Sequence, residues 1–165
     1  MLGLDEYRRM VLAIALLERG SRVSIVHHVT GLPRVFIRRV YRELYGSPPH
    51  GGQLPTTATV MATRNRQVQA SLWACLYLTF GGPQVRRRLD AVALMDSYDV
   101  YLQVLRGQKE VARLDINDAW VVARDLRGGT AEILSCARCQ VCYLVCSEPR
   151  LPPSCPICAL RGRGR

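Results

Sequence analysis

Apolar residues recur at helical spacing along most of the chain between Asp5 and Gly129. In the first such segment, Tyr7, Val11 and Ile14 fall on one side of a helix that Gly20 is expected to end. Similar patterns, bounded by capping residues or glycines, mark five more helices. The six predicted helices cover residues 5–19, 22–29 (behind a Ser21 cap), 33–45, 57–80, 85–106 and 116–127 (behind an Asp115 cap).

The pattern also divides the chain into parts. Residues 47–56 are rich in proline and glycine and are predicted to be a linker, and after Gly129 the helical period gives way to short β-branched pieces, prolines and cysteines. The predicted fold is therefore mainly α. Its four predicted parts are 1–46 (helical, basic and helix-turn-helix-like), 47–56 (linker), 57–129 (long helices) and 130–165 (a small ribbon-like four-cysteine module with a basic tail).

No segment of the sequence is predicted to cross a membrane. The longest apolar stretches, Val11–Leu17 and Leu72–Phe80, are much shorter than the roughly 20 residues that span a bilayer. Asp5 and Glu6 lie where a signal peptide would be basic. We therefore expect a cytoplasmic protein, in which thiols stay reduced and clustered cysteines indicate a metal rather than disulfides.

Four cysteines have the spacing of a structural metal site. Cys136 and Cys139 form one C-x-x-C pair, Cys155 and Cys158 form another, and 15 residues separate the pairs. Two such pairs bring four thiolates to one ion at ~2.3 Å and leave no position open for water. The sequence therefore predicts one structural Zn²⁺ per chain, although four thiolates also suit iron.

A shifted set of ligands is the alternative, because Cys142 and Cys146 lie close to Cys139 in the sequence. Both fall in or beside a strand-like run at Val141–Val145, where buried small side chains are the simpler interpretation. Cys75 lies in the middle of an apolar helix and is predicted to belong to the core.

Positive charge is concentrated at the two ends of the chain. The net charge is +10, and residues 1–88 carry 13 arginines against 4 acids, whereas residues 89–134 are net acidic. On a helical wheel of residues 33–45, the arginines gather opposite the apolar side chains. These candidate DNA-binding residues are Arg34, Arg38, Arg39 and Arg42. Sequence-specific binding would require arginines such as Arg38 or Arg42 at base edges.

These features together resemble the C subunit of the bacterial flagellar master transcriptional regulator, the FlhC family. The densest similarity runs from Val29 to Pro55, and Ala70–Tyr77 and Leu114–Trp120 are similar to later helices of the family. The resemblance implies that Cys136, Cys139, Cys155 and Cys158 are zinc ligands. It also implies a transcription activator that binds double-stranded promoter DNA of flagellar and some other operons. The implied partner is the D subunit, in a hetero-oligomer expected to be a heterohexamer, and RNA polymerase is a further candidate.

Two other classes of function remain open from the sequence. One is a zinc-stabilised adaptor whose basic face binds an acidic protein, and the other is an RNA-binding zinc protein. Only 11 aromatic residues are present, and no stacking platform for RNA bases is visible. No phosphate-binding glycine loop, nucleophile elbow or open metal site is found, so an enzyme is not expected.

Overall fold

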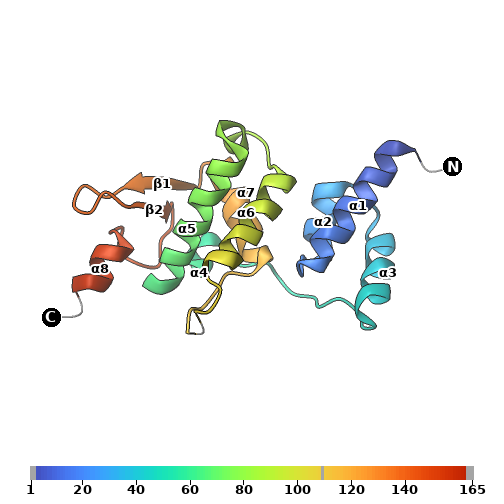
Figure 1. The fold of residues 1–165 in the computed structure, drawn as a ribbon, viewed down its shortest axis with the longest axis horizontal. Helices are drawn as coiled ribbons and strands as arrows, with labels where there is room; N and C mark the ends of the chain where they lie inside the picture. The colour runs from blue at the N-terminus through green and yellow to red at the C-terminus, as the bar shows by residue number, and fades with distance from the viewer. Residues whose placement is uncertain (1–2, 109, 163–165) are drawn as a thin grey trace. The chain divides into compact units, whose positions relative to one another are not determined.

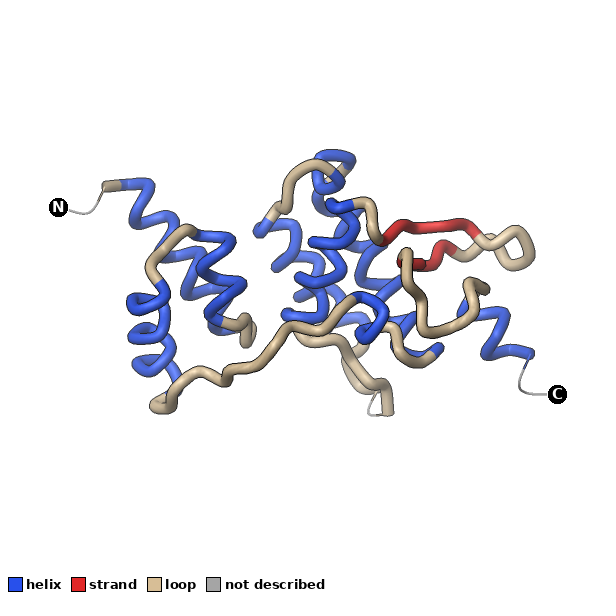
Figure 2. Tube along the Cα trace, turned by 180° about the vertical axis from the view of Figure 1, so that it is seen from behind, coloured by secondary structure: helices blue, strands red, loops and turns tan. Residues whose placement is uncertain are grey.

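The computed structural model describes residues 3–108 and 110–162, and it is mainly helical with one small antiparallel sheet (Figures 1 and 2). The prediction of a mainly α fold with a small C-terminal module is confirmed. The chain forms two compact units, Met1–Gln53 and Leu54–Arg165. The predicted division into four parts is finer than this and stays a prediction. Among the described residues, no helix is long and apolar enough to cross a membrane.

The first unit is a bundle of three helices. Its core contains apolar side chains from all three helices, among them Leu16, Val26 and Ile37. The Tyr45 hydroxyl donates a hydrogen bond of 2.7 Å to the Leu17 carbonyl and so ties the end of the third helix to the first. The three helices are α1 (Leu4–Glu18), α2 (Val23–Thr30) and α3 (Arg34–Tyr45).

The turn between α2 and α3 is held by local hydrogen bonds. The Thr30 hydroxyl donates to the Val26 carbonyl at 2.7 Å and accepts from the Leu32 N–H at 3.2 Å. Gly31 has a φ of 70°, a left-handed conformation that suits glycine at the end of a helix. The short helix, tight turn and longer helix expected of a helix-turn-helix-like segment are therefore present.

The second unit packs around α5 (Arg64–Gly81). Trp73 and Tyr77 on this helix are fully buried and stacked, with ring centroids 5.1 Å apart. Two later helices, α6 (Ala91–Val104) and α7 (Ile116–Gly128), and the strand β2 (Cys142–Cys146) all contact α5. The helices of this unit are α4 (Thr57–Val60), α5 (Arg64–Gly81), the 3₁₀ helix η1 (Pro83–Arg86), α6 (Ala91–Val104), α7 (Ile116–Gly128) and α8 (Pro156–Gly162).

A two-stranded hairpin follows α7. Its strands, β1 (Ala131–Ser135) and β2 (Cys142–Cys146), are antiparallel, and Ile133 pairs with Leu144. Leu144 is fully buried, and its N–H donates to the Ser71 hydroxyl of α5 at 2.9 Å. The hairpin is thereby fixed to α5, and the loop between the strands carries the first pair of cysteines.

Two predicted long helices are broken in the structure. The helix predicted for 57–80 is interrupted before Arg64, because the Thr63 side chain accepts a hydrogen bond from the Arg66 N–H and starts a new helix. The helix predicted for 85–106 begins only at Ala91. There the Asp90 side chain accepts from the Ala93 N–H in the same way.

One smaller expectation about a helix end also differs from the structure. Arg22 rather than Ser21 occupies the N-cap position of α2, and the Ser21 side chain is buried. Helix α8 was not expected from the sequence. The predicted Asp115 cap of α7 is present as a complete capping box with Asp118.

Candidate functional site

The structure brings the sulfur atoms of Cys136, Cys139, Cys155 and Cys158 within 4.8 Å of one another. The Cys136 and Cys158 sulfurs lie 3.8 Å apart, and those of Cys139 and Cys155 lie 3.6 Å apart. Four sulfurs placed tetrahedrally at ~2.3 Å from a zinc ion are separated by ~3.8 Å. The four thiols therefore have the arrangement needed to hold one metal ion.

The first pair of cysteines lies in a tight backbone turn, and the second pair lies at the start of a helix. The Cys136 N–H donates to the Val141 carbonyl at 3.0 Å, and the Gln140 N–H donates back to the Cys136 carbonyl at 2.8 Å. Gln140 adopts a φ of 60°, which reverses the chain after the first pair. In the second pair, Cys155 directly precedes α8, and Cys158 lies within that helix. The turn and the helix start thus present all four sulfurs toward a common centre.

The electrostatics of the cluster favour a bound cation. Backbone N–H groups of Cys139 and then Arg138 point at the Cys136 sulfur and lower the pKa of Cys136 to about 6. In contrast, the neighbouring thiols, Cys139 first, raise the pKa of Cys158 to about 12. Crowded thiolates repel one another, and a cation between them relieves that repulsion. Four sulfurs fill a tetrahedral shell, so the site suits a structural role rather than catalysis.

The other three cysteines lie outside this cluster. Cys142 is exposed at the start of β2, with its sulfur 3.5 Å from the Ser135 hydroxyl, and Cys146 ends the same strand. Burial raises the pKa of Cys146 and of Cys75, which favours their neutral thiol forms. The shifted set of ligands would need the Cys142 sulfur in the cluster, whereas in the structure this sulfur lies beside the Ser135 hydroxyl.

A buried arginine supports the second pair of cysteines. The Arg64 guanidinium donates to the Pro152 carbonyl at 3.0 Å and to the Ser154 carbonyl at 2.9 Å. It also donates to the Ser154 hydroxyl at 2.8 Å, so one side chain of α5 fixes the segment that leads into Cys155. Nothing in the sequence pattern separates Arg64 from the exposed arginines, because the Pro152 and Ser154 carbonyls that it contacts lie about 90 residues away.

Arg66 likewise has a role within the fold. Its guanidinium donates to the Asp118 carboxylate at 2.8 Å and to the Arg113 carbonyl at 2.8 Å. Arg64 and Arg66 thus both join segments of the second unit that lie far apart in the sequence.

The four predicted DNA-binding arginines are all exposed on α3, in the first unit. Ile37, on the opposite side of the helix, is fully buried. The helix therefore has the exposed basic face and the buried apolar face that the helical wheel predicts. The Arg39 guanidinium lies 5.6 Å from the centre of the Phe36 ring. The arginine side chains thus form a positively charged surface on a helix whose other face is anchored in the core.

Comparison with known proteins identifies a family for the chain. A model of the family described as "Flagellar transcriptional activator (FlhC)" matches residues 3–165. The chain is similar to three proteins named flagellar transcriptional regulator FlhC. That of Thauera aminoaromatica is 30% identical over 82% of this chain and 67% of its own length. That of Paraburkholderia atlantica is 29% identical over 81% and 61%, and that of Cupriavidus necator is 29% identical over 98% and 81%.

The matched region thus spans 61% to 81% of the length of these relatives. The family match extends over the whole described chain, so it contains both the basic helix and all four clustered cysteines. The chain belongs to the FlhC family of flagellar transcriptional regulators.

Proposed function

We propose that this chain is the DNA-binding subunit of a heteromeric activator that binds promoters of flagellar operons and activates their transcription. The observation that carries the proposal is the exposed arginine face of α3 in a helix-turn-helix-like unit. In such motifs the second helix enters the major groove, where arginines contact guanine edges and phosphates. Membership of a family of transcriptional regulators supports the same function.

The proposed metal is one structural Zn²⁺ per chain, held by Cys136, Cys139, Cys155 and Cys158. The separations of 3.6 and 3.8 Å between paired sulfurs fit zinc bound by four thiolates. Bound there, the ion would join the hairpin loop to α8 and so stabilise the C-terminal module. The cytoplasm, where thiols stay reduced, suits this site.

The proposed protein partner is the D subunit of the flagellar regulator, in a hetero-oligomer with a heterohexamer as the expected form, and RNA polymerase is a further candidate partner. Helix α1 leaves Leu4, Tyr7, Val11 and Ile14 exposed at helical spacing on one face. An exposed apolar stripe of this kind fits contact with another protein. It is compatible with the DNA-binding function because α3 carries the basic face.

A competition experiment tests the proposal against its two alternatives. A labelled flagellar promoter duplex is bound by the chain together with the D subunit, and unlabelled scrambled duplex, structured RNA or promoter duplex is then added. We expect promoter duplex to compete at least roughly a thousandfold better than the other two, which is the lower end of the usual range for specific DNA binding. Stronger competition by RNA would support an RNA-binding protein. No binding to any duplex would support the adaptor.

A variant tests whether α3 is responsible for the preference for promoter DNA. Arg42→Ala is expected to reduce the preference for promoter over scrambled duplex by roughly tenfold, as for the loss of one arginine contact to a base. Zinc content and helicity should be unchanged, because Arg42 is exposed and Ile37 anchors the helix. An unchanged preference would show that Arg42 does not contact bases.

A further inference from the structure

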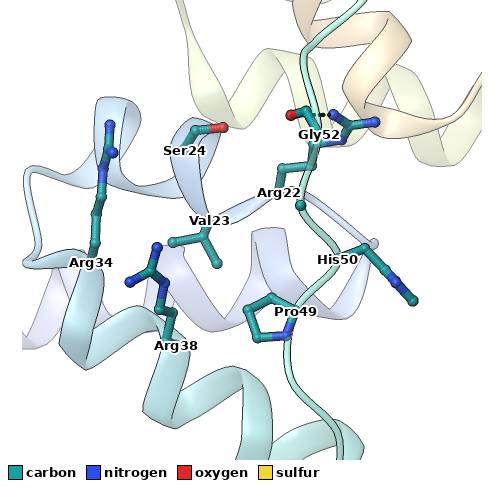
Figure 3. Close-up of a pocket in the computed structure, with 9 residues that line it drawn as sticks. Arg22, Val23, Ser24, Arg34, Arg38, Pro49, His50 and Gly52 are labelled. Carbon is teal, nitrogen blue, oxygen red and sulfur yellow. Dashed lines mark hydrogen bonds between the residues drawn. The ribbon is translucent and has the colours of Figure 1, made fainter.

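A hollow of about 180 Å³ opens in the first unit beside the basic helix. It lies where the beginnings of α2 and α3 meet the connector that follows α3 (Figure 3). In this view the Arg38 guanidinium points from α3 toward Val23, whereas the His50 ring points away from Arg38. The residues that line the hollow include Arg34, Arg38, Val23, Ser24, Gly51 and Gly52.

The hollow is positively charged. Arg34 and Arg38 are exposed, and no acidic residue is among those that line the hollow. The first turn of α2 contains no acid, and no side chain caps its N–H groups. The positive end of the α2 dipole therefore adds to the charge of the two arginines, and the Ser24 hydroxyl supplies a further donor.

The connector is held in place along one side of the hollow. The Arg22 guanidinium donates to the Gly52 carbonyl at 3.0 Å and to the Gln53 carbonyl at 2.9 Å. Gly52 has a φ of 122°, a backbone conformation that residues with side chains rarely adopt. Gly51 and Gly52 line the hollow with backbone alone and add no charged side chain of their own.

We propose that this hollow binds one phosphate group of the duplex DNA backbone, held by Arg34 and Arg38 with Ser24 and the start of α2. The inference rests on the proposed function and deepens it, because it divides the basic face into two parts. Arg34 and Arg38 bind backbone phosphate and fix the register of α3 on the duplex. Arg39 and Arg42 lie outside the hollow and remain available to base edges.

A scan of neutralised phosphates tests the proposal. Promoter duplexes that each carry one uncharged methylphosphonate in place of a backbone phosphate are bound, at low salt, by the full chain with the D subunit. At the position that enters the hollow, we expect binding to weaken roughly tenfold, because charge-assisted hydrogen bonds are lost. The double variant Arg34→Ala with Arg38→Ala should bind less tightly overall and should no longer distinguish that duplex from the unmodified one.

Arg39→Ala is the matched control, because it removes the same charge from the same helix outside the hollow. Arg39→Ala should weaken binding to every duplex. It should still bind roughly tenfold less tightly to the duplex whose methylphosphonate lies at the hollow. If the double variant keeps the effect while wild-type protein still prefers the promoter, the phosphate site is wrong and the proposed function stands. If wild-type protein binds no duplex, the proposed function itself fails.

Inorganic phosphate distinguishes a DNA site from a site for a small anion. We expect millimolar phosphate to shift the amide NMR signals of Ser24 and Gly52 only weakly, and promoter duplex to shift them at far lower concentration. Strong shifts with phosphate alone, combined with no position-specific effect in the scan, would assign a free anion to the hollow and overturn the DNA assignment.

Discussion

Cys136 and Cys142 lie six residues apart in the hairpin, and their thiols have different surroundings. The Cys136 sulfur lies 3.8 Å from that of Cys158, whereas the Cys142 sulfur lies beside the Ser135 hydroxyl. We expect Cys136→Ser to lose the bound metal and to destabilise the C-terminal module, because three thiolates hold zinc less tightly than four. Metal content of the purified protein, determined by elemental analysis, measures the effect.

Cys142→Ser is the matched control in the same hairpin. It should keep one metal ion per chain, because Cys142 lies outside the cluster. If Cys136→Ser kept the ion and Cys142→Ser lost it, the shifted set of ligands would be correct.

Arg64 lies far in the sequence from the second pair of cysteines and yet supports it. Arg64→Met keeps most of the side-chain volume and removes the donors to Pro152 and Ser154. Because these partners are partly buried, we expect a loss of about 2–3 kcal/mol in the free energy of unfolding, measured with urea. Metal should also transfer faster to a chelator, since the segment before Cys155 loses its attachment. Arg86→Met, at an exposed arginine, should change neither quantity.

At the scale of elements, the end of α5 depends on a glycine. A methyl group at Gly81 would collide with the Val85 side chain of η1 and lie 3.1 Å from the Ala93 β-carbon of α6. Gly81→Ala is therefore expected to destabilise the second unit by about 1–3 kcal/mol, the usual cost of overpacking a core. Thermal and urea unfolding measure it.

Gly128→Ala provides the comparison at the end of α7. A β-carbon there would meet only the Thr130 hydroxyl at 4.0 Å, so the substitution should be neutral or stabilising. Equal destabilisation by Gly81→Ala and Gly128→Ala would show that the close contact at Gly81 does not determine the stability of the second unit.

Elements with clear local signals were predictable from the sequence. The beginning and end of α7 follow from the Asp115 cap and the terminal glycines, and the tight turn before α3 follows from Thr30 and Gly31. The breaks before α5 and α6 were missed because Thr63 and Asp90 lie within continuous helical patterns, and their capping role is visible only from their hydrogen bonds.

The candidate sites were predictable to a similar extent. Spacing alone indicated the four cysteines, and a helical wheel indicated the exposed arginines of α3. The hollow beside Arg34 and the contacts of Arg64 could not be predicted, because both depend on segments brought together by the fold.

At the scale of the whole molecule, the two compact units should respond differently to loss of metal. All four clustered cysteines belong to the Leu54–Arg165 unit, whereas the core of α1–α3 is apolar. We expect a strong zinc chelator to increase amide hydrogen exchange in β1, β2 and α8, because metal binding and local folding are coupled. Exchange in α1–α3 should stay unchanged, and equal loss of protection there would contradict separate stabilisation of the units.

The net charge of +10 is the property of the whole chain that bears on its partner. Arginine contacts to phosphates release counterions from duplex DNA, so binding weakens steeply as salt rises. Specific contacts to bases add a preference for promoter sequence that nonspecific charge attraction does not provide.

Fluorescence anisotropy of a flagellar promoter duplex across a salt series, with and without the D subunit, tests whether the chain binds promoter DNA. We expect steep salt dependence, tighter binding to promoter than to scrambled duplex, and a larger difference when the D subunit is present. Equal binding to both duplexes under all conditions, or no binding at physiological salt, would contradict a promoter-binding function and point to an acidic protein as the partner of the basic face.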